Sequence, residues 1–157
     1  MIECEDRMGV VVLRMARGKG NAMNVDFLHA LEKELVRLEQ SEARSVILTG
    51  TGSVFSAGVD LVELTQAGPA YIREFLPALC SFFEKLLTFP KPVVSAVNGH
   101  AIAGGCIVCL ESDYRIMSCG GGKIGLTELP VGVPFPPLVL EIVRMGVAPQ
   151  AYPKVIN

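Results

Sequence analysis

Four leucines between residues 25 and 39 recur at the spacing of one helix face, three or four positions apart. These are Leu28, Leu31, Leu35 and Leu38. The charged residues of the same stretch fall mainly on the other faces, as in a helix with one buried side. Asn24 precedes the stretch, and an asparagine side chain can bind a free N–H of the first helical turn. We therefore predict a helix from residue 25 to about residue 39 that covers a sheet.

A second long helix is predicted from Pro69 to about Phe89, because apolar residues again recur at helical spacing. The apolar set consists of Ile72, Phe75, Leu76, Leu79, Phe82, Phe83 and Leu86. Pro69 suits a first helical turn, whereas Pro77 lies inside and is expected to kink or divide the helix. Pro90 then ends the helical pattern.

Short runs of β-branched and apolar residues separate the helical stretches and predict strands. The runs are residues 10–13, 45–49, 93–97 and 114–117. Two shorter helices are predicted, one over residues 104–111 that begins with a pair of glycines and one over residues 137–145. Strands that alternate with covering helices indicate an α/β fold with parallel pairing, which we place in a single domain of residues 1–157.

The composition excludes several classes of partner. The 14 basic and 16 acidic residues give a net charge of −2, and no run of Lys or Arg forms a footprint for nucleic acid. Residues 93–110 are the most apolar window, but they include Asn98, His100 and three glycines. A strand, a turn and a buried helix therefore explain this window better than a membrane span does.

Five cysteines are scattered through apolar surroundings, and we expect them to be buried free thiols. An odd number of cysteines without an N-terminal signal peptide favours a reducing, cytoplasmic setting. Cys106 and Cys109 form a C-x-x-C pair, but no second pair or histidine cluster completes a zinc site. We predict no metal.

Two segments place small residues at the junction of a strand and a helix, namely residues 55–61 and 98–105. Backbone N–H groups at a helix start have no partner within the helix, so such junctions can hold a negatively charged oxygen. Taken singly, each segment is better explained as a turn. A phosphate-binding loop is excluded for residues 99–105, because no Lys-Ser/Thr pair follows.

An ordered set of motifs resembles the crotonase (enoyl-CoA hydratase/isomerase) superfamily. The motifs are Gly20-Asn21-Ala22-Met23-Asn24, Phe55-Ser56-Ala57-Gly58-Val59-Asp60-Leu61, Lys91-Pro92-Val93-Val94-Ser95-Ala96-Val97-Asn98-Gly99, Ala103-Gly104-Gly105-Cys106, Ser112-Asp113-Tyr114-Arg115-Ile116 and Ile124-Gly125-Leu126-Thr127-Glu128. The resemblance implies a spiral of repeated ββα units and assembly into trimers or hexamers. It also implies that a coenzyme A thioester binds across the core, with CoA as part of the substrate and no separate cofactor.

The resemblance further assigns individual site residues. The backbone N–H groups of Val59 and Gly104 would form an oxyanion hole for the thioester oxygen. The residues implied to bind CoA, largely through their main chain, are Ala22, Ala57, Gly58, Leu61 and Gly105. Two preorganised donors of this kind can each lower a barrier by ~3 kcal/mol.

Glu128 is the candidate base for moving a proton. Its apolar neighbours Leu126, Leu129 and Val131 would raise the carboxyl pKa toward neutrality in a closed site. A solvated loop glutamate is the alternative reading. His100 and Asp60 are expected to support a turn and to cap or brace backbone, and not to act on substrate.

Ile107 stands where typical hydratases carry a second glutamate. Hydration is usually described with two carboxylates, whereas one carboxylate suffices to move a double bond between β,γ and α,β positions. A single Glu128 therefore favours an enoyl-CoA isomerase. A hydratase, other single-carboxylate acyl-CoA chemistry, and a non-catalytic acyl-CoA-binding or assembly subunit stay open as alternatives.

Members of the family continue well beyond the helix predicted at residues 137–145, whereas this sequence stops at residue 157. Either the sequence does not include the C-terminal helical part of the family, or the protein is a truncated form that lacks it. Apolar edges left exposed by that absence would seek a partner.

Overall fold

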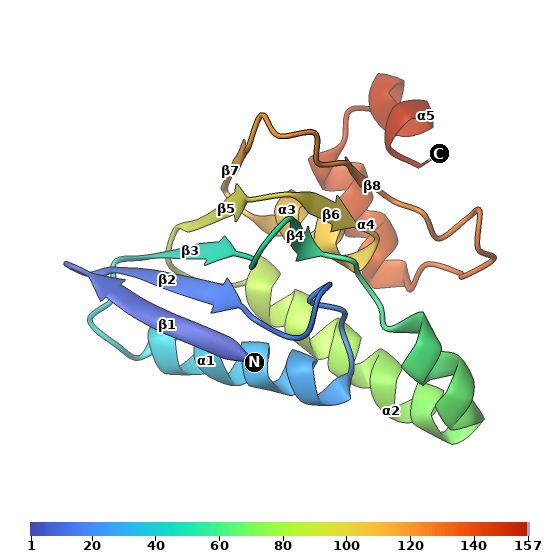
Figure 1. Ribbon diagram of the computed structural model, residues 1–157, viewed down its shortest axis with the longest axis horizontal. Helices are drawn as coiled ribbons and strands as arrows, with labels where there is room; N and C mark the ends of the chain where they lie inside the picture. The colour runs from blue at the N-terminus through green and yellow to red at the C-terminus, as the bar shows by residue number, and fades with distance from the viewer. Residues whose placement is uncertain (157) are drawn as a thin grey trace.

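The computed structural model describes residues 1–156 and shows two parallel-type sheets covered by helices (Figure 1). The larger sheet has the strand order β1-β2-β3-β5-β7. Its strands are β1 (Ile2–Arg7), β2 (Val10–Met15), β3 (Ser45–Thr49), β5 (Val93–Val97) and β7 (Tyr114–Met117). Only the β1–β2 pair is antiparallel, so the predicted α/β class with parallel pairing is confirmed.

A second, smaller sheet has the order β4-β6-β8 and is parallel throughout. Its strands are β4 (Val54–Ser56), β6 (His100–Ile102) and β8 (Ile124–Gly125). The helices are α1 (Val25–Glu39), α2 (Leu61–Leu87), α3 (Gly104–Glu111) and α4 (Pro137–Gly146), followed by η1 (Pro149–Ala151) and α5 (Tyr152–Val155). Each turn of the chain thus adds one strand to each sheet and then a helix: β3-β4-α2, β5-β6-α3 and β7-β8-α4. This is the expected spiral of ββα units.

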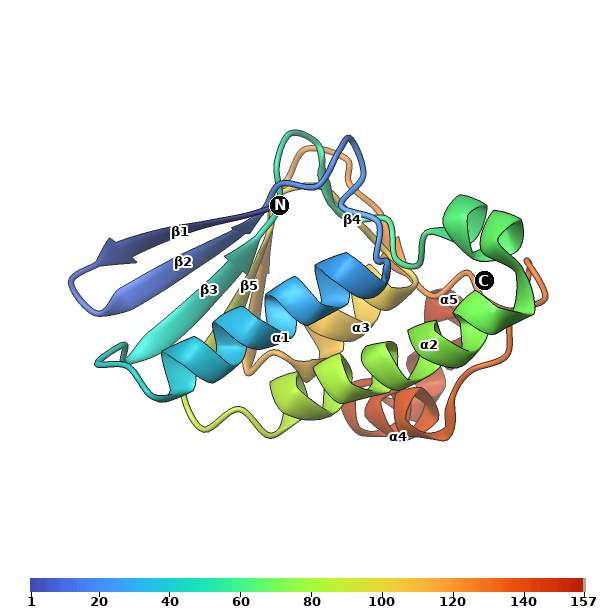
Figure 2. The ribbon, with the colours of Figure 1, turned by 90° about the horizontal axis from the view of Figure 1, so that it is seen from below.

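Helix α1 has the predicted bounds because its cap and its apolar face agree. The side chain of Asn24 accepts a hydrogen bond from the N–H of Phe27 at 3.0 Å. The predicted leucines of α1 are all buried in the hydrophobic core. Helices α1 and α2 run side by side on one side of that sheet (Figure 2).

Helix α2 is divided, but not where the sequence predicted. Its one non-helical residue is Gly68, with φ 77° and ψ −170°, and Pro69 begins the second segment as predicted. The expectation that Pro77 divides the helix is wrong, because the backbone stays helical there. Pro77 is exposed, so water can satisfy the carbonyl left without a partner. The first segment, residues 61–67, was not predicted.

The core lies between the sheets and helices α1 to α4. Helix α3 is buried on nearly all sides, packing against β4, β6, α2 and α4. All five cysteines are free, but Cys4 and Cys119 are exposed and Cys80 is half-buried, so the expectation of burial holds only for Cys106 and Cys109. Within residues 1–156 there is no helix long and apolar enough to span a membrane, and no group of three metal-ligating side chains.

Candidate functional site

The two glycine-containing junctions meet in space. Gly58 has φ 81°, and a Cβ placed on it would lie 2.6 Å from Ala103 Cβ and 2.8 Å from the backbone nitrogen of Gly104. The chain after β4 and the start of α3 are therefore in direct backbone contact. Only glycine fits at residue 58, both for its dihedral angles and for this close approach.

We expect Gly58→Ala to destabilise the fold by about 2 kcal/mol or more, because the added Cβ forces residue 104 to move away. Gly121→Ala is the matched control, since Gly121 has φ 82° but no atom within 4 Å of an added Cβ. Urea unfolding of the two variants would measure the effect. Equal losses in the two variants would show that the close approach of residue 58 to residue 104 has no importance.

The backbone N–H groups of Val59 and Gly104 have no acceptor among residues 1–156. The residues around Val59 pair with Met23, whose N–H donates to the Gly58 carbonyl at 2.7 Å. The Asp60 N–H in turn donates to the Met23 carbonyl at 2.9 Å, so the Val59 N–H faces away from that pairing. Gly104 is the first residue of α3, where N–H groups lack a helical partner and the helix dipole favours negative charge.

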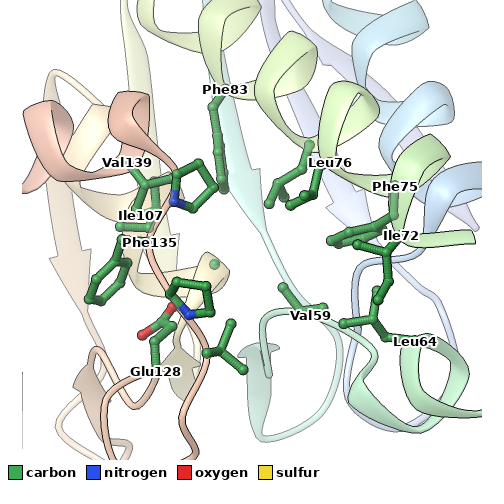
Figure 3. A pocket seen from close by; sticks show the side chains of 15 residues that line it. Val59, Leu64, Ile72, Phe75, Leu76, Phe83, Ile107, Glu128, Phe135 and Val139 are labelled. Atoms are coloured by element: carbon green, nitrogen blue, oxygen red, sulfur yellow. The ribbon is translucent and has the colours of Figure 1, made fainter. Parts of the chain in front are cut away.

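Val59 and Gly104 line one apolar cavity together with Glu128, and Figure 3 shows Val59 and Glu128 in its wall. The empty space among its lining residues is about 510 Å³, part of which is open to solvent. Helix α2 supplies much of its wall, and α4 together with the segment before it supplies the facing side. The wall residues from these two parts are Leu64, Ile72, Phe75, Leu76, Leu79, Phe83, Val133, Pro134, Phe135, Pro136 and Val139.

A smaller adjoining cavity contains two of the residues implied to bind CoA, Ala57 and Leu61. Val59 and Glu128 line both cavities and therefore lie where the two adjoin. Ala22 lines neither cavity, and its carbonyl accepts a hydrogen bond from Arg17 at 2.7 Å.

The two remaining glycines of that set lie behind the cavity wall. Gly58 is buried against the start of α3, as described above. Gly105 is also buried, and its Cα packs so closely on β4 that an added Cβ would lie 2.5 Å from the Ser56 carbonyl oxygen. Both glycines thus allow the two junctions to approach each other.

Glu128 is half-buried, and its Oε2 atom is shielded from solvent without a hydrogen-bond partner among the described residues. Burial raises the pKa of the Glu128 carboxyl, although interactions with the backbone at Glu128 and Thr127 act in the opposite direction. Of the described side chains that line either cavity, only that of Glu128 is titratable. Ile107, which is 1% exposed, lines the larger cavity and contributes no polar atom.

An ionic network that sequence reasoning missed holds the segment between Val59 and Leu64. Arg17 binds Asp60 at 3.0 Å and Glu63 at 3.3 Å. Glu63 also accepts hydrogen bonds from Tyr71 at 2.8 Å and from Asn24 at 2.9 Å. The network ties the start of α2 to the start of α1. The basic, glycine-rich stretch around Arg17 could have indicated a binding role for this arginine. Its partners Asp60 and Glu63 could not be inferred, because they lie 43 and 46 residues further along the chain.

Residues expected to be structural have such roles. Asp60 caps α2 by accepting from the Glu63 N–H at 3.1 Å. The ring nitrogen Nδ1 of His100 accepts from the Lys123 N–H at 3.2 Å, and His100 lines neither cavity.

Comparison with known proteins identifies related sequences. The model of the enoyl-CoA hydratase/isomerase family matches residues 5–151. The mitochondrial enoyl-CoA delta isomerase 1 of Rattus norvegicus is 34% identical over 139 residues, covering 87% of this chain and 48% of that protein. A short-chain-enoyl-CoA hydratase of Clostridium acetobutylicum is 33% identical over 135 residues, covering 85% and 51%. The chain thus spans about half the length of these relatives.

Solved structures show the same fold. An enoyl-CoA hydratase/isomerase family protein from Pseudomonas syringae has a TM-score of 0.90 and 30% identity, over 99% of this chain and 66% of that one. Human mitochondrial delta3-delta2-enoyl-CoA isomerase has a TM-score of 0.82 and 29% identity, over 99% and 69%. The expected crotonase-type fold is confirmed.

Proposed function

The chain belongs to the enoyl-CoA hydratase/isomerase family, and on this premise we propose that it isomerises enoyl-CoA thioesters with Glu128 as the proton carrier. One observation carries the proposal. The Glu128 carboxyl lines the same cavity as Val59 and Gly104, whose N–H groups have no acceptor among residues 1–156.

In this mechanism the thioester carbonyl lies where the two cavities adjoin. The CoA portion enters along the smaller cavity, past Ala57 and Leu61, and the acyl chain enters the larger one. The N–H groups of Val59 and Gly104 donate to the carbonyl oxygen, which gains negative charge when the neighbouring carbon loses a proton. Donors fixed in a water-poor site stabilise that charge without reorganising, by ~3 kcal/mol each.

Glu128 removes a proton from the carbon next to the thioester, and the electron pair spreads over the enolate and the β,γ double bond. The same carboxyl then returns the proton to the γ carbon, and the double bond moves to the α,β position. The raised pKa of Glu128 suits both steps, because it makes the carboxylate a stronger base. Atoms and charge balance without a separate cofactor.

The apolar wall around Ile107 favours isomerisation over hydration, because it offers no second carboxylate to hold and activate a water. Relatives of both kinds match the chain, so the two reactions must be compared directly.

We expect the purified protein to convert a 3-enoyl-CoA to the 2-enoyl-CoA at least about tenfold faster than it hydrates crotonyl-CoA. Absorbance of the conjugated thioester follows both reactions, since isomerisation creates the conjugated bond and hydration removes it. Faster hydration would instead favour the hydratase. Binding of acyl-CoA without exchange of the α proton in deuterated water would favour a non-catalytic binding subunit.

A further inference from the structure

The larger cavity continues into a surface groove on the far side of Leu76. Four residues line both the cavity and the groove, namely Leu76, Pro134, Phe135 and Pro136. The groove adds Pro77 and Cys80 from α2 and Pro137 from the start of α4. Leu76 is 42% exposed, so it lies at the mouth of the cavity and not in its floor.

The cavity extends from the proposed reaction centre toward this groove. In Figure 3, Val59 and Glu128 lie at one end of the view, and Leu76 and Phe83 lie toward the other. An acyl chain whose carbonyl is held near Val59 therefore runs along α2 toward Leu76.

We propose that the preferred substrates are long-chain enoyl-CoA thioesters, whose hydrocarbon tail passes between Leu76 and Phe135 and lies in the groove over Cys80. This inference rests on the proposed function and specifies its substrate class. Continuity with the reaction cavity is what identifies the occupant as the tail of the same substrate.

The chemistry of the groove suits hydrocarbon. Among residues 1–156, no charged side chain lines the groove, and its walls consist of leucine, phenylalanine, cysteine and proline. Three of its prolines lie in the segment before and at the start of α4, and proline has no backbone N–H that would need a polar partner. Each methylene group that the groove removes from water raises affinity by up to about fourfold. A polar or charged tail would gain nothing from such walls.

Cys80 gives a readout of groove occupancy that does not depend on turnover. Cys80 is half-buried in the groove, and burial raises the pKa of its thiol, so alkylation by N-ethylmaleimide is slow enough to follow. Saturating tetradecanoyl-CoA is expected to slow alkylation of Cys80 at least about fivefold, whereas butanoyl-CoA leaves the rate unchanged. Peptide mass spectrometry resolves the site, and the exposed Cys119 in the same digest is the internal control.

If both esters protect Cys80, the groove does not bind the long tail specifically. The same holds if neither ester protects Cys80 although calorimetry shows that both bind. Either result would refute the inference about the groove without contradicting the proposed function. If calorimetry shows that neither ester binds, the proposed function itself fails, and the inference fails with it.

A substitution that fills the groove supplies an independent test. Cys80→Trp is expected to lower the ratio of kcat/KM for tetradecenoyl-CoA to that for hexenoyl-CoA at least about tenfold. Glu74→Trp places the same side chain at an exposed position of α2 outside the groove, and we expect it to leave the ratio within twofold. An unchanged ratio in a folded Cys80→Trp protein would refute the inference. If that variant does not fold, the alkylation result decides.

Discussion

Replacing Glu128 with glutamine is expected to lower kcat for enoyl-CoA isomerisation by about 10³-fold, a typical contribution of general acid–base catalysis. The amide keeps the size of the carboxyl but cannot accept the α proton. Only Glu128 among the described side chains lining either cavity can titrate, so no neighbour can take over its role. Binding of a saturated acyl-CoA should change less than about threefold, because Val59 and Gly104 are untouched. Stopped-flow assays and calorimetry separate the two effects.

Glu111→Gln is the matched control, since Glu111 is also a carboxyl shielded from solvent without a partner but lies outside both cavities. We expect its kcat to match that of the unmodified protein. In the unmodified protein, kcat/KM should rise with pH as Glu128 ionises. Because burial raises the pKa of Glu128, we expect this rise at a higher pH than for an ordinary glutamate. A Glu128→Gln protein with more than a tenth of normal kcat would refute the mechanism.

The second large effect is on stability, where Glu111→Gln is expected to stabilise the protein by ~2 to 4 kcal/mol at pH 8 and very little at pH 4. Glu111 ends α3, and both of its carboxyl oxygens lack a hydrogen-bond partner within residues 1–156. Burial raises the pKa of this carboxyl to about 9. A negative charge at a helix C-terminus is also unfavourable.

The direction of the pH dependence follows from these pKa values. Below the ordinary value of 4.5, Glu111 is protonated in both the folded and the unfolded chain, and its burial adds no charge penalty. Between about 4.5 and 9 the unfolded chain releases the proton and the folded chain keeps it, so the free energy of unfolding falls as pH rises. Glutamine cannot ionise and avoids this loss.

Urea unfolding at several pH values measures the difference between the two proteins. Glu74→Gln, on the exposed face of α2, should shift the free energy of unfolding by less than about 0.5 kcal/mol. A difference between Glu111→Gln and the unmodified protein that stays constant from pH 4 to pH 8 would contradict the explanation by burial.

Much of the α/β core was predictable because local signals agreed with tertiary packing. Asn24 and the four leucines predicted the start of α1 and the approximate position of its end, since a cap and an amphipathic face favour the same bounds. Strands β3, β5 and β7 were also predicted with their observed bounds. In each, an apolar run has enough length to distinguish it from a turn.

Elements that depend on distant pairing were missed. Strand β8 has two residues and β6 has three, and a period of two cannot be recognised over so short a run. Strand β1 carries four charged residues and lies at the edge of the sheet, so it lacks the apolar pattern of a buried strand. The start of α2 was missed because Gly68 and Pro69 indicate a loop, and the helical turns before them were therefore not recognised.

The candidate site was predictable only through the family resemblance. Nothing in the spacing of Val59, Gly104 and Glu128 shows that they share a cavity, because the spiral brings together segments far apart in the sequence. The ion pairs of Arg17 with Asp60 and Glu63 were missed for the same reason. Two of the residues implied to bind CoA line a cavity, whereas Ala22 supports backbone through its carbonyl.

The position of Val59 and Glu128 on the boundary between two cavities has a consequence for how the family can diversify. Under the proposed mechanism, the common CoA portion and the variable acyl portion contact different sets of residues. Substitutions in the turns of α2 that are distant from Val59, or in the proline-rich segment before α4, would then change which acyl chains the protein accepts. Neither the reacting atoms nor the recognition of the shared carrier would be disturbed.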